Sequence, residues 1–207
     1  GNGRAGENWM GMMADVRLFT AALTPVQLAD VVPVVIDDFE GDPNLPDWTI
    51  DDANAVAVAV DPLDPNNNAL LGAAGAMNMS QPLVVDPNGH ITFGFKVLYE
   101  AIDPNDPNIA EGALNDLVIA VGDGAGTAWG NLYAIVRLGQ GERLDFRNGG
   151  AYETMIEATE PMTWYSIVMD IDSAAKTYDI YVDGLLLVED AAFRSQDPDG
   201  IQQVWVK

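Results

Sequence analysis

The sequence contains no cysteine and a single histidine, His90. The lack of cysteine excludes disulfides and metal sites built from thiolates. One histidine also excludes metal sites that need two imidazoles and mechanisms that need a pair of histidines. The chemistry of any site must therefore come from oxygen ligands, amides, aromatic rings and a few cations.

Basic residues are scarce as well. Nine Lys and Arg stand against 32 Asp and Glu, so the formal net charge is −23. Nucleic-acid binding needs a cationic surface that neutralises phosphates, and adhesion to an anionic membrane needs the same. No apolar run approaches the roughly 20 residues of a membrane-spanning helix. We therefore expect neither a nucleic-acid partner nor membrane insertion.

What the chain does contain favours a folded β domain. It has 207 residues, 48% of them hydrophobic, which is enough for a sizeable core and argues against disorder. Of the 32 acidic residues, 23 are Asp, and Gly and Pro number 20 and 12. These residues belong in turns rather than in helices.

Short segments of alternating apolar residues dominate between these turn residues, a pattern typical of a β-sandwich. The expected strands are 55–60, 90–99, 117–121, 132–138, 164–171, 177–182, 185–188 and 201–206. Only Thr24 to Val31 predicts a helix, because Thr24 can cap it and Pro25 suits its first turn.

Two parts of the sequence resemble a known family. Trp164 to Asp170, followed by Tyr178 to Gly184, is similar to the central hairpin of laminin-G-like, concanavalin-A-like jelly rolls. Gly6 to Phe19 resembles the closing strand of such a domain, with Ala14 where an Asp is usual. The resemblance implies an all-β, two-sheet antiparallel jelly-roll sandwich of the bacterial secreted type. It also implies an extracellular or cell-surface location.

The order of these motifs predicts two parts. Residues 34–41 resemble an opening segment and 200–207 a second closing strand, so residues 34–207 form one jelly roll. Residues 1–33 then resemble the closing strand and short helix of a preceding domain. Three outcomes stay open for 1–31. The segment packs onto its own sandwich, completes a preceding domain, or completes a neighbouring subunit and so forms a homo-oligomer or filament.

Sugar binding needs aromatic planes together with amide, carboxylate or guanidinium partners for hydroxyl groups. One stretch supplies these groups, and the even spacing of its first three residues would place them on one face of a strand. The candidates are Trp129, Tyr133, Arg137, Arg147, Asn148 and Tyr152. The alternative is ordinary core packing for the aromatic rings and solvated charge for the arginines. We assign Trp164 and Trp205 to the core.

Five loops contain Asp-Pro, and two interpretations apply to them. Asp-Pro is good turn chemistry, whereas clustered oxygen ligands would suit calcium. In several carbohydrate-binding jelly rolls a Glu soon after the opening Phe binds a structural calcium. The resemblance therefore implies a calcium site at Glu40, with Asp42 and Asp199 as further ligands.

Catalytic patterns are missing from the sequence. Jelly-roll glycosidases of this superfamily carry E-x-D-x-x-E on one strand, and the nearest pair here, Asp170 and Asp172, is interpreted as a strand-end turn. His90 is interpreted as a strand-start residue without a partner.

The predicted function is a non-catalytic binding module for a glycan or a neighbouring cell-surface protein. The alternatives are a structural subunit joined by strand exchange and, third, a glycan hydrolase or lyase.

Overall fold

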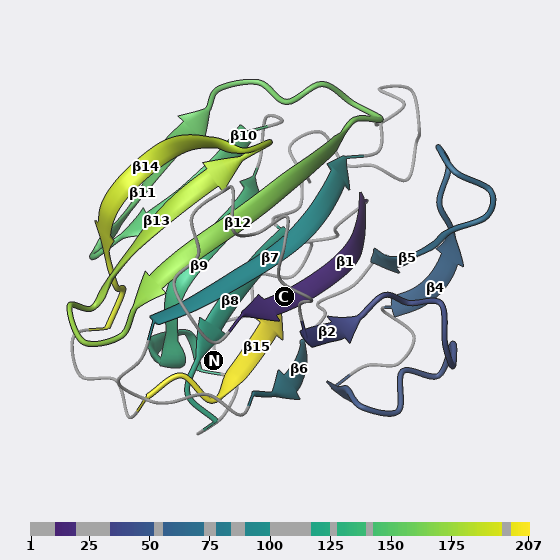
Figure 1. Ribbon diagram of the computed structural model, residues 1–207, viewed down its shortest axis with the longest axis horizontal. Helices are drawn as coiled ribbons and strands as arrows, with labels where there is room; N and C mark the ends of the chain where they lie inside the picture. The colour runs from purple at the N-terminus through teal and green to yellow at the C-terminus, as the bar shows by residue number, and fades with distance from the viewer. Residues whose placement is uncertain are drawn as a thin grey trace.

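The computed structural model describes residues 11–19, 34–51, 56–72, 78–83, 90–99, 117–124, 128–139, 143–195 and 200–207. In this part of the chain two antiparallel sheets pack face to face (Figure 1). The predicted all-β, two-sheet antiparallel sandwich is confirmed. The predicted helix at 24–31 lies outside the described residues.

Sheet A crosses the front of Figure 1. Its strands are, in spatial order, β14 (Leu185–Ala192), β13 (Thr177–Val182), β12 (Trp164–Asp172), β7 (His90–Tyr99), β1 (Gly11–Phe19), β5 (Asn68–Gly72) and β4 (Val56–Val60). A further strand, β2 (Val34–Asp37), pairs with Val16 to Leu18 at the C-terminal end of β1. Two of the predicted strands, 90–99 and 177–182, have the bounds given by the sequence pattern.

Sheet B lies behind sheet A in this view. Its strands are, in spatial order, β11 (Ala151–Ile156), β10 (Arg143–Asn148), β9 (Leu132–Gly139), β8 (Leu117–Gly122), β15 (Gln203–Val206), β6 (Met79–Pro82) and β3 (Thr49–Ile50). A 3-10 turn, η1 (Trp129–Asn131), precedes β9. Among the described residues no helix has the length and hydropathy needed to cross a bilayer.

β1 lies in the interior of sheet A, between β7 and β5 (Figure 1). Met13 is the register partner of Val97 on one side and of Leu70 on the other. Met13 and Val16 are fully buried in the sandwich core. In this structure residues 11–19 of the segment thus pack within their own chain, as in the first of the three outcomes. The division of the chain at residue 33 stays a prediction.

The core forms where alternate side chains of the two sheets meet, with Phe93, Phe95 and Ile167 from sheet A facing Ile119 and Val136 from sheet B. Such alternation follows from the period of two along a strand. Polar contacts also cross the sandwich. The phenol of Tyr178 on β13 donates to the carbonyl oxygens of Ile135, at 3.1 Å, and of Arg147. The buried hydroxyl therefore has hydrogen-bond partners, as buried polar groups generally do.

The hairpin between β13 and β14 turns at Asp183-Gly184, as the sequence predicted. Both residues have positive φ, 50° and 81°, which is the backbone of a two-residue type I′ turn. The Asp183 carboxylate also accepts a hydrogen bond from the backbone N–H of Ser166 at 2.9 Å. This contact anchors the turn to the start of β12, beside the cleft described next.

Candidate functional site

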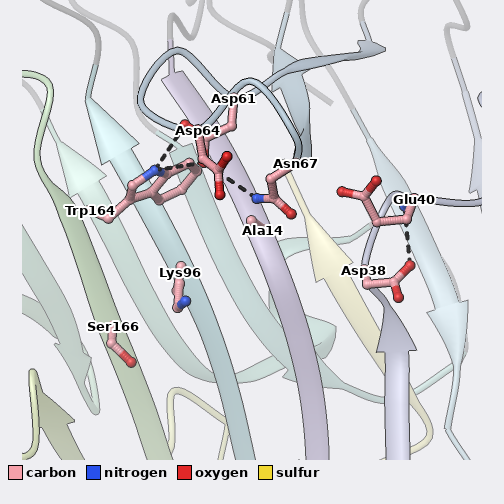
Figure 2. Close-up of a pocket in the computed structure, with 9 residues that line it drawn as sticks. All are labelled: Ala14, Asp38, Glu40, Asp61, Asp64, Asn67, Lys96, Trp164 and Ser166. Carbon is pink, nitrogen blue, oxygen red and sulfur yellow. Dashed lines mark hydrogen bonds between the residues drawn. The ribbon is translucent and has the colours of Figure 1, made fainter.

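A cleft of about 580 Å³ opens on the outer face of sheet A, the face turned away from sheet B (Figure 2). This volume lies within the range of small-ligand sites, about 300–1,000 Å³. The lining residues come from strands β1, β7 and β12 and from two loops. They are Ala14, Asp38, Glu40, Asp61, Asp64, Asn67, Lys96, Trp164 and Ser166.

The floor of the cleft is a row of side chains across three neighbouring strands. Ala14 on β1 is the register partner of Lys96 on β7, which in turn is the partner of Ser166 on β12. Trp164 stands two residues from Ser166, hence on the same face of β12. Its indole packs against a small apolar cluster that contains Ala14 and Leu98. The floor therefore combines apolar surface with a hydroxyl and an ammonium group.

One rim is the loop between β4 and β5, which carries Asp61, Asp64 and Asn67 (Figure 2). The Asp61 side chain is 5% exposed and accepts hydrogen bonds from the Trp164 Nε1 at 3.2 and 3.1 Å. It also accepts from the backbone N–H of Leu63 at 2.8 Å and from the Asn67 amide at 3.3 Å. One carboxylate thus ties this rim to the indole on the floor.

The other rim is the loop that follows β2. Both carboxylate oxygens of Glu40 accept hydrogen bonds from Asn68, one from its backbone N–H and one from its side-chain amide at 3.0 Å. Asp38 accepts from the backbone N–H of Glu40 at 3.1 Å. Both side chains are exposed, so the rim presents negative charge to solvent on this side of the cleft.

The Asp-Pro loops that the structure describes form hydrogen-bonded turns, as the turn interpretation of the sequence predicted. Asp42, Asp61 and Asp64 each accept a hydrogen bond from the backbone N–H two residues later, at 2.9, 2.8 and 3.0 Å. In each case a proline stands between donor and acceptor and presets the backbone of the turn. The backbone hydrogen bond from Asn44 is the main cause that lowers the pKa of Asp42.

The predicted calcium ligands do not meet one another among the described residues. Glu40 is engaged by Asn68 and Asp42 by Asn44, while Asp199 lies outside the described residues. Where side chains are described, no three His, Asp or Glu residues form a group suited to a metal ion. Calcium at this loop stays a prediction.

Tyr133 does not share a face with Trp129 and Arg137, so this part of the sequence prediction is wrong. Its ring is 1% exposed, stacks on Phe193 in the core, and its hydroxyl donates to Asp123 at 2.6 Å. The cause is a β-bulge. Ala134 pairs with Val121 but Leu132 pairs with Gly122, so Tyr133 is an extra residue that breaks the alternation along β9.

Three of the predicted ligand residues do come together, on the outer face of sheet B. The guanidinium groups of Arg137 and Arg147 lie 3.8 and 4.9 Å from the centroid of the Tyr152 ring. Arg137 also forms an ion pair with the buried carboxylate of Asp145. Asn148 is occupied elsewhere, since its amide donates to Glu153 and its oxygen accepts from the Ala192 backbone, both at 3.0 Å.

Trp129, the remaining candidate, is 43% exposed in the turn η1. Two cations that the sequence analysis did not name lie near its ring. The Arg194 Cζ is 5.5 Å and the Lys207 Nζ 5.3 Å from the ring centroid. No spacing rule links residues 129, 194 and 207, so only the fold could bring them together.

The two tryptophans assigned to the core differ in the structure. Trp164 is half-buried on the outer face of sheet A, where it lines the cleft, so its assignment to the core is wrong. The cross-strand register places Trp164 beside Leu98, in the small outer cluster. Trp205 is 4% exposed, as expected, but it packs with Val118 and Leu132 on the outer face of sheet B.

His90 has a partner, contrary to the prediction. Its Nε2 lies 3.0 Å from the Asp172 carboxylate, because the antiparallel register sets the first residue of β7 opposite the last residue of β12. Asp172 also accepts hydrogen bonds from the backbone N–H groups of Ala174 and Ala175, at 2.9 and 2.8 Å. The bond from Ala175 is the main cause that lowers its pKa. Asp172 is thus the strand-end turn residue that was predicted.

Comparisons with known proteins found distant similarities alone. No protein-family model matches the chain, and no curated protein matches it. A solved structure named "Sialidase" is 15% identical with a TM-score of 0.42, covering 77% of this chain and 13% of that one. Another, a "putative carbohydrate binding protein from Bacteroides ovatus ATCC 8483", is 10% identical with a TM-score of 0.27, covering 98% and 71%. Similarity at this level carries no argument about function.

Proposed function

We propose that this protein is a non-catalytic extracellular module that binds a glycan in the cleft of sheet A. The observation that carries the proposal is the composition of the cleft. An indole and a methyl group lie beside an ammonium, a hydroxyl, an amide and several carboxylates in one open space of about 580 Å³. Sugars offer an apolar ring face and a rim of hydroxyl groups, and these side chains suit both.

The state of two of the four cleft carboxylates, Asp61 and Glu40, favours binding over hydrolysis. A glycosidase needs one carboxyl group that donates a proton and a second that attacks or activates water. Here Asp61 accepts from Trp164, Leu63 and Asn67, and both oxygens of Glu40 accept from Asn68. Carboxylates fixed in this way position loops and accept hydrogen bonds from hydroxyl groups. This is the role we assign to them.

We also propose the kind of domain, its location and its partner. The strand from Trp164 to Asp172 and the Asp183-Gly184 turn carry the resemblance to laminin-G-like domains, and both lie in sheet A beside the cleft. Domains of this kind act outside the cell by binding. We therefore place the protein outside the cell or on its surface, with a glycan as its partner.

A glycan array probed with the full chain tests the proposal, followed by calorimetry on the best neutral oligosaccharide. We expect Lys96→Gln and Ser166→Ala each to weaken binding about twofold to tenfold, in keeping with net values of about 0.5–1.5 kcal/mol for single hydrogen bonds. Lys176→Gln is the matched control, since Lys176 lies in the turn between β12 and β13, away from the cleft lining. The bound sugar should be recovered uncleaved.

Two results would contradict the proposal. One is that no neutral glycan is retained on the array. The other is that the Lys96 and Ser166 variants bind as well as the parent chain, which would separate binding from the cleft. Release of reducing ends from a bound oligosaccharide would show that the module is an enzyme.

A further inference from the structure

An amine, a carboxamide and a carboxyl group lie in a row on sheet B, across three neighbouring strands. The strands are β15, β6 and β3, of which the first two lie side by side in Figure 1. Their antiparallel register sets Asn78, just before β6, between Lys207, just after β15, and Asp51, just after β3. Residues from three distant parts of the sequence are thus neighbours at one end of the sheet.

The backbone holds all three residues in place. The N–H of Asp51 donates to the carbonyl oxygen of Asn78 at 3.0 Å. On the other side of the row, the N–H and carbonyl groups of Lys207 form hydrogen bonds with Val118 on β8, at 2.9 and 2.8 Å. Because the sheet has already fixed these backbones, only side-chain torsions remain to be set for a reaction between the groups.

The amine and the carboxamide are in contact. The Nζ of Lys207 donates to the Oδ1 of Asn78 at 2.6 Å, and the two residues are 129 positions apart in the sequence. A carbonyl bond is about 1.2 Å long, so the Cγ of Asn78 lies no more than about 3.8 Å from that Nζ. Reacting atoms in a near-attack arrangement are about 3–3.5 Å apart. The contact therefore holds the nitrogen close to a carbon that it can attack.

The surroundings of the Lys207 amine increase its neutral fraction. Burial is the main cause that lowers the pKa of Lys207, and the negative charge of Asp51 opposes this shift. A neutral amine is the form that attacks a carbonyl carbon, so the lowered pKa favours reaction. The ring centroids of Trp129 and Trp205 lie 5.3 and 5.5 Å from the Nζ, so indole rings replace part of the water around it. Asp51 provides a carboxylate beside the reacting pair.

We propose that Lys207 and Asn78 join in an intramolecular isopeptide bond, with Asp51 as the proton carrier. The neutral Nζ attacks the Cγ of Asn78, and the Asp51 carboxylate accepts a proton from the attacking nitrogen. It then delivers this proton to the amide nitrogen of Asn78, the old C–N bond breaks, and ammonia leaves. The product has one new Nζ–Cγ bond and one ammonia fewer, and the step needs no oxidant or cofactor.

Such a bond would do for this chain what a disulfide does for others. The sequence contains no cysteine, so it cannot form disulfides. An amide between residues 78 and 207 closes a long loop and restricts the unfolded chain, and cross-links that close long loops stabilise most. It also joins β6 to β15, which lies in the interior of sheet B between β6 and β8. This role is independent of glycan binding in the cleft.

Intact-mass spectrometry of the full chain after incubation at neutral pH tests the proposal. We expect a mass lower by one ammonia than the sequence requires, and a proteolytic map with a linked peptide that contains residues 78 and 207. Lys207→Arg should keep the full mass and should melt about 10 °C or more below the parent. Asp51→Asn should slow the loss of ammonia at least about a hundredfold, the usual size of a proton-transfer contribution. Lys176→Arg, in the turn between β12 and β13, is the matched control and should behave as the parent.

Three results would overturn the proposal. The first is a parent chain that keeps its full mass and gives no linked peptide. The second is a loss of ammonia that persists in Lys207→Arg, because cyclisation at Asn148-Gly149 also releases ammonia without linking two strands. The third is an unchanged rate in Asp51→Asn. If Lys207→Arg fails to fold, the peptide map of the parent decides alone, since only the isopeptide bond links residues 78 and 207.

Discussion

The indole Nε1 of Trp164 donates to both carboxylate oxygens of Asp61, at 3.2 and 3.1 Å, across 103 residues of sequence. An indole has a single N–H, so this donor is shared between two acceptors. The contact fixes the β4–β5 loop against β12 and shapes one wall of the cleft (Figure 2). Stability and the form of the cleft therefore depend on the same pair.

Asp61→Ala should destabilise the fold by about 1–3 kcal/mol, because it leaves the partly buried donors of Trp164 and Leu63 without an acceptor. Urea unfolding measures the loss. Asp64→Ala is the control, since Asp64 is exposed and, among the described residues, its carboxylate accepts hydrogen bonds from Asn66 alone. Equal stability of the two variants would mean that the Trp164 contact contributes nothing.

Gly122→Ala should destabilise the protein by at least about 1–3 kcal/mol, the usual cost of overpacking. A Cβ at this position would lie 1.9 Å from the backbone oxygen of Asn131, where β9 carries its bulge. Gly130→Ala is the matched control, because a Cβ there has nothing within 4 Å. Thermal unfolding of the two variants should differ clearly, and similar melting temperatures would argue against the bulge geometry.

Asp170→Asn should stabilise the protein at neutral pH. Burial is the main cause that raises the pKa of Asp170, opposed by His90 and the Thr92 hydroxyl and increased by Asp179 and Asp172. In the folded state the proton is therefore bound more tightly than in the unfolded chain, whose pKa is near 3.8. Stability from this group is fully present below that pKa and falls as pH rises through the raised value.

Asparagine does not titrate, so the advantage of Asp170→Asn should be largest near pH 7 and should vanish as the pH approaches about 3.8, the ordinary pKa. Melting curves across this range measure it. Asp190, which is exposed, provides the control, as Asp190→Asn should change stability little. A lower melting temperature of Asp170→Asn at pH 7 would show that the ionised carboxylate is stabilising.

Packing of β1 within its own chain predicts a melting temperature that does not depend on protein concentration over about a hundredfold range. Strand exchange between subunits predicts a melting temperature that rises with protein concentration.

Deleting residues 1–31 should abolish cooperative unfolding, because it removes the strand between β7 and β5. Met13→Ala is the milder variant and should cost about 2–5 kcal/mol. A truncated chain as stable as its parent would show that β1 is dispensable.

The predicted calcium should stabilise the fold without taking part in chemistry. Since a cation bound only to the folded state stabilises it by mass action, a hundredfold excess over Kd is worth about 2.7 kcal/mol. The melting temperature should therefore rise from chelator to millimolar calcium, and Glu40→Gln should remove the rise. Glu189→Gln, at an exposed position on β14, serves as the control. An identical melting temperature in chelator and calcium would end this hypothesis.

Local patterns in the sequence were enough for much of the fold. Period-two alternation located β7 and β13, and Asp183-Gly184 located the hairpin, because both depend on residues close together in sequence. The strands β5 and β6 were missed, since Gly72 and Pro82 at their ends look like turn residues. β10 and β11 were missed too, because charged residues interrupt their apolar pattern.

The candidate site was harder than the fold to predict from the sequence, for two physical reasons. A bulge at Tyr133 reversed the expected face, and a bulge depends on the partner strand rather than on the residue itself. The cleft joins Ala14, Lys96 and Ser166 through cross-strand register. Arg194 and Lys207 approach Trp129 in the same way, through tertiary structure. Residue types alone gave part of the chemistry, and the topology decided which groups meet.

The interior position of β1 has a consequence for synthesis of the protein in the cell. Met13 pairs with Val97, which leaves the ribosome 84 residues later. At about 5–20 residues per second, the apolar strand waits roughly 4–17 s before its main partner exists. The β7 side of β1 therefore stays unpaired until Val97 has been translated, although β2 and β5, its other neighbours, are translated earlier. During that interval Met13 and Val16 are available to chaperones, so the order of synthesis, rather than the final stability, sets when this sandwich is most vulnerable.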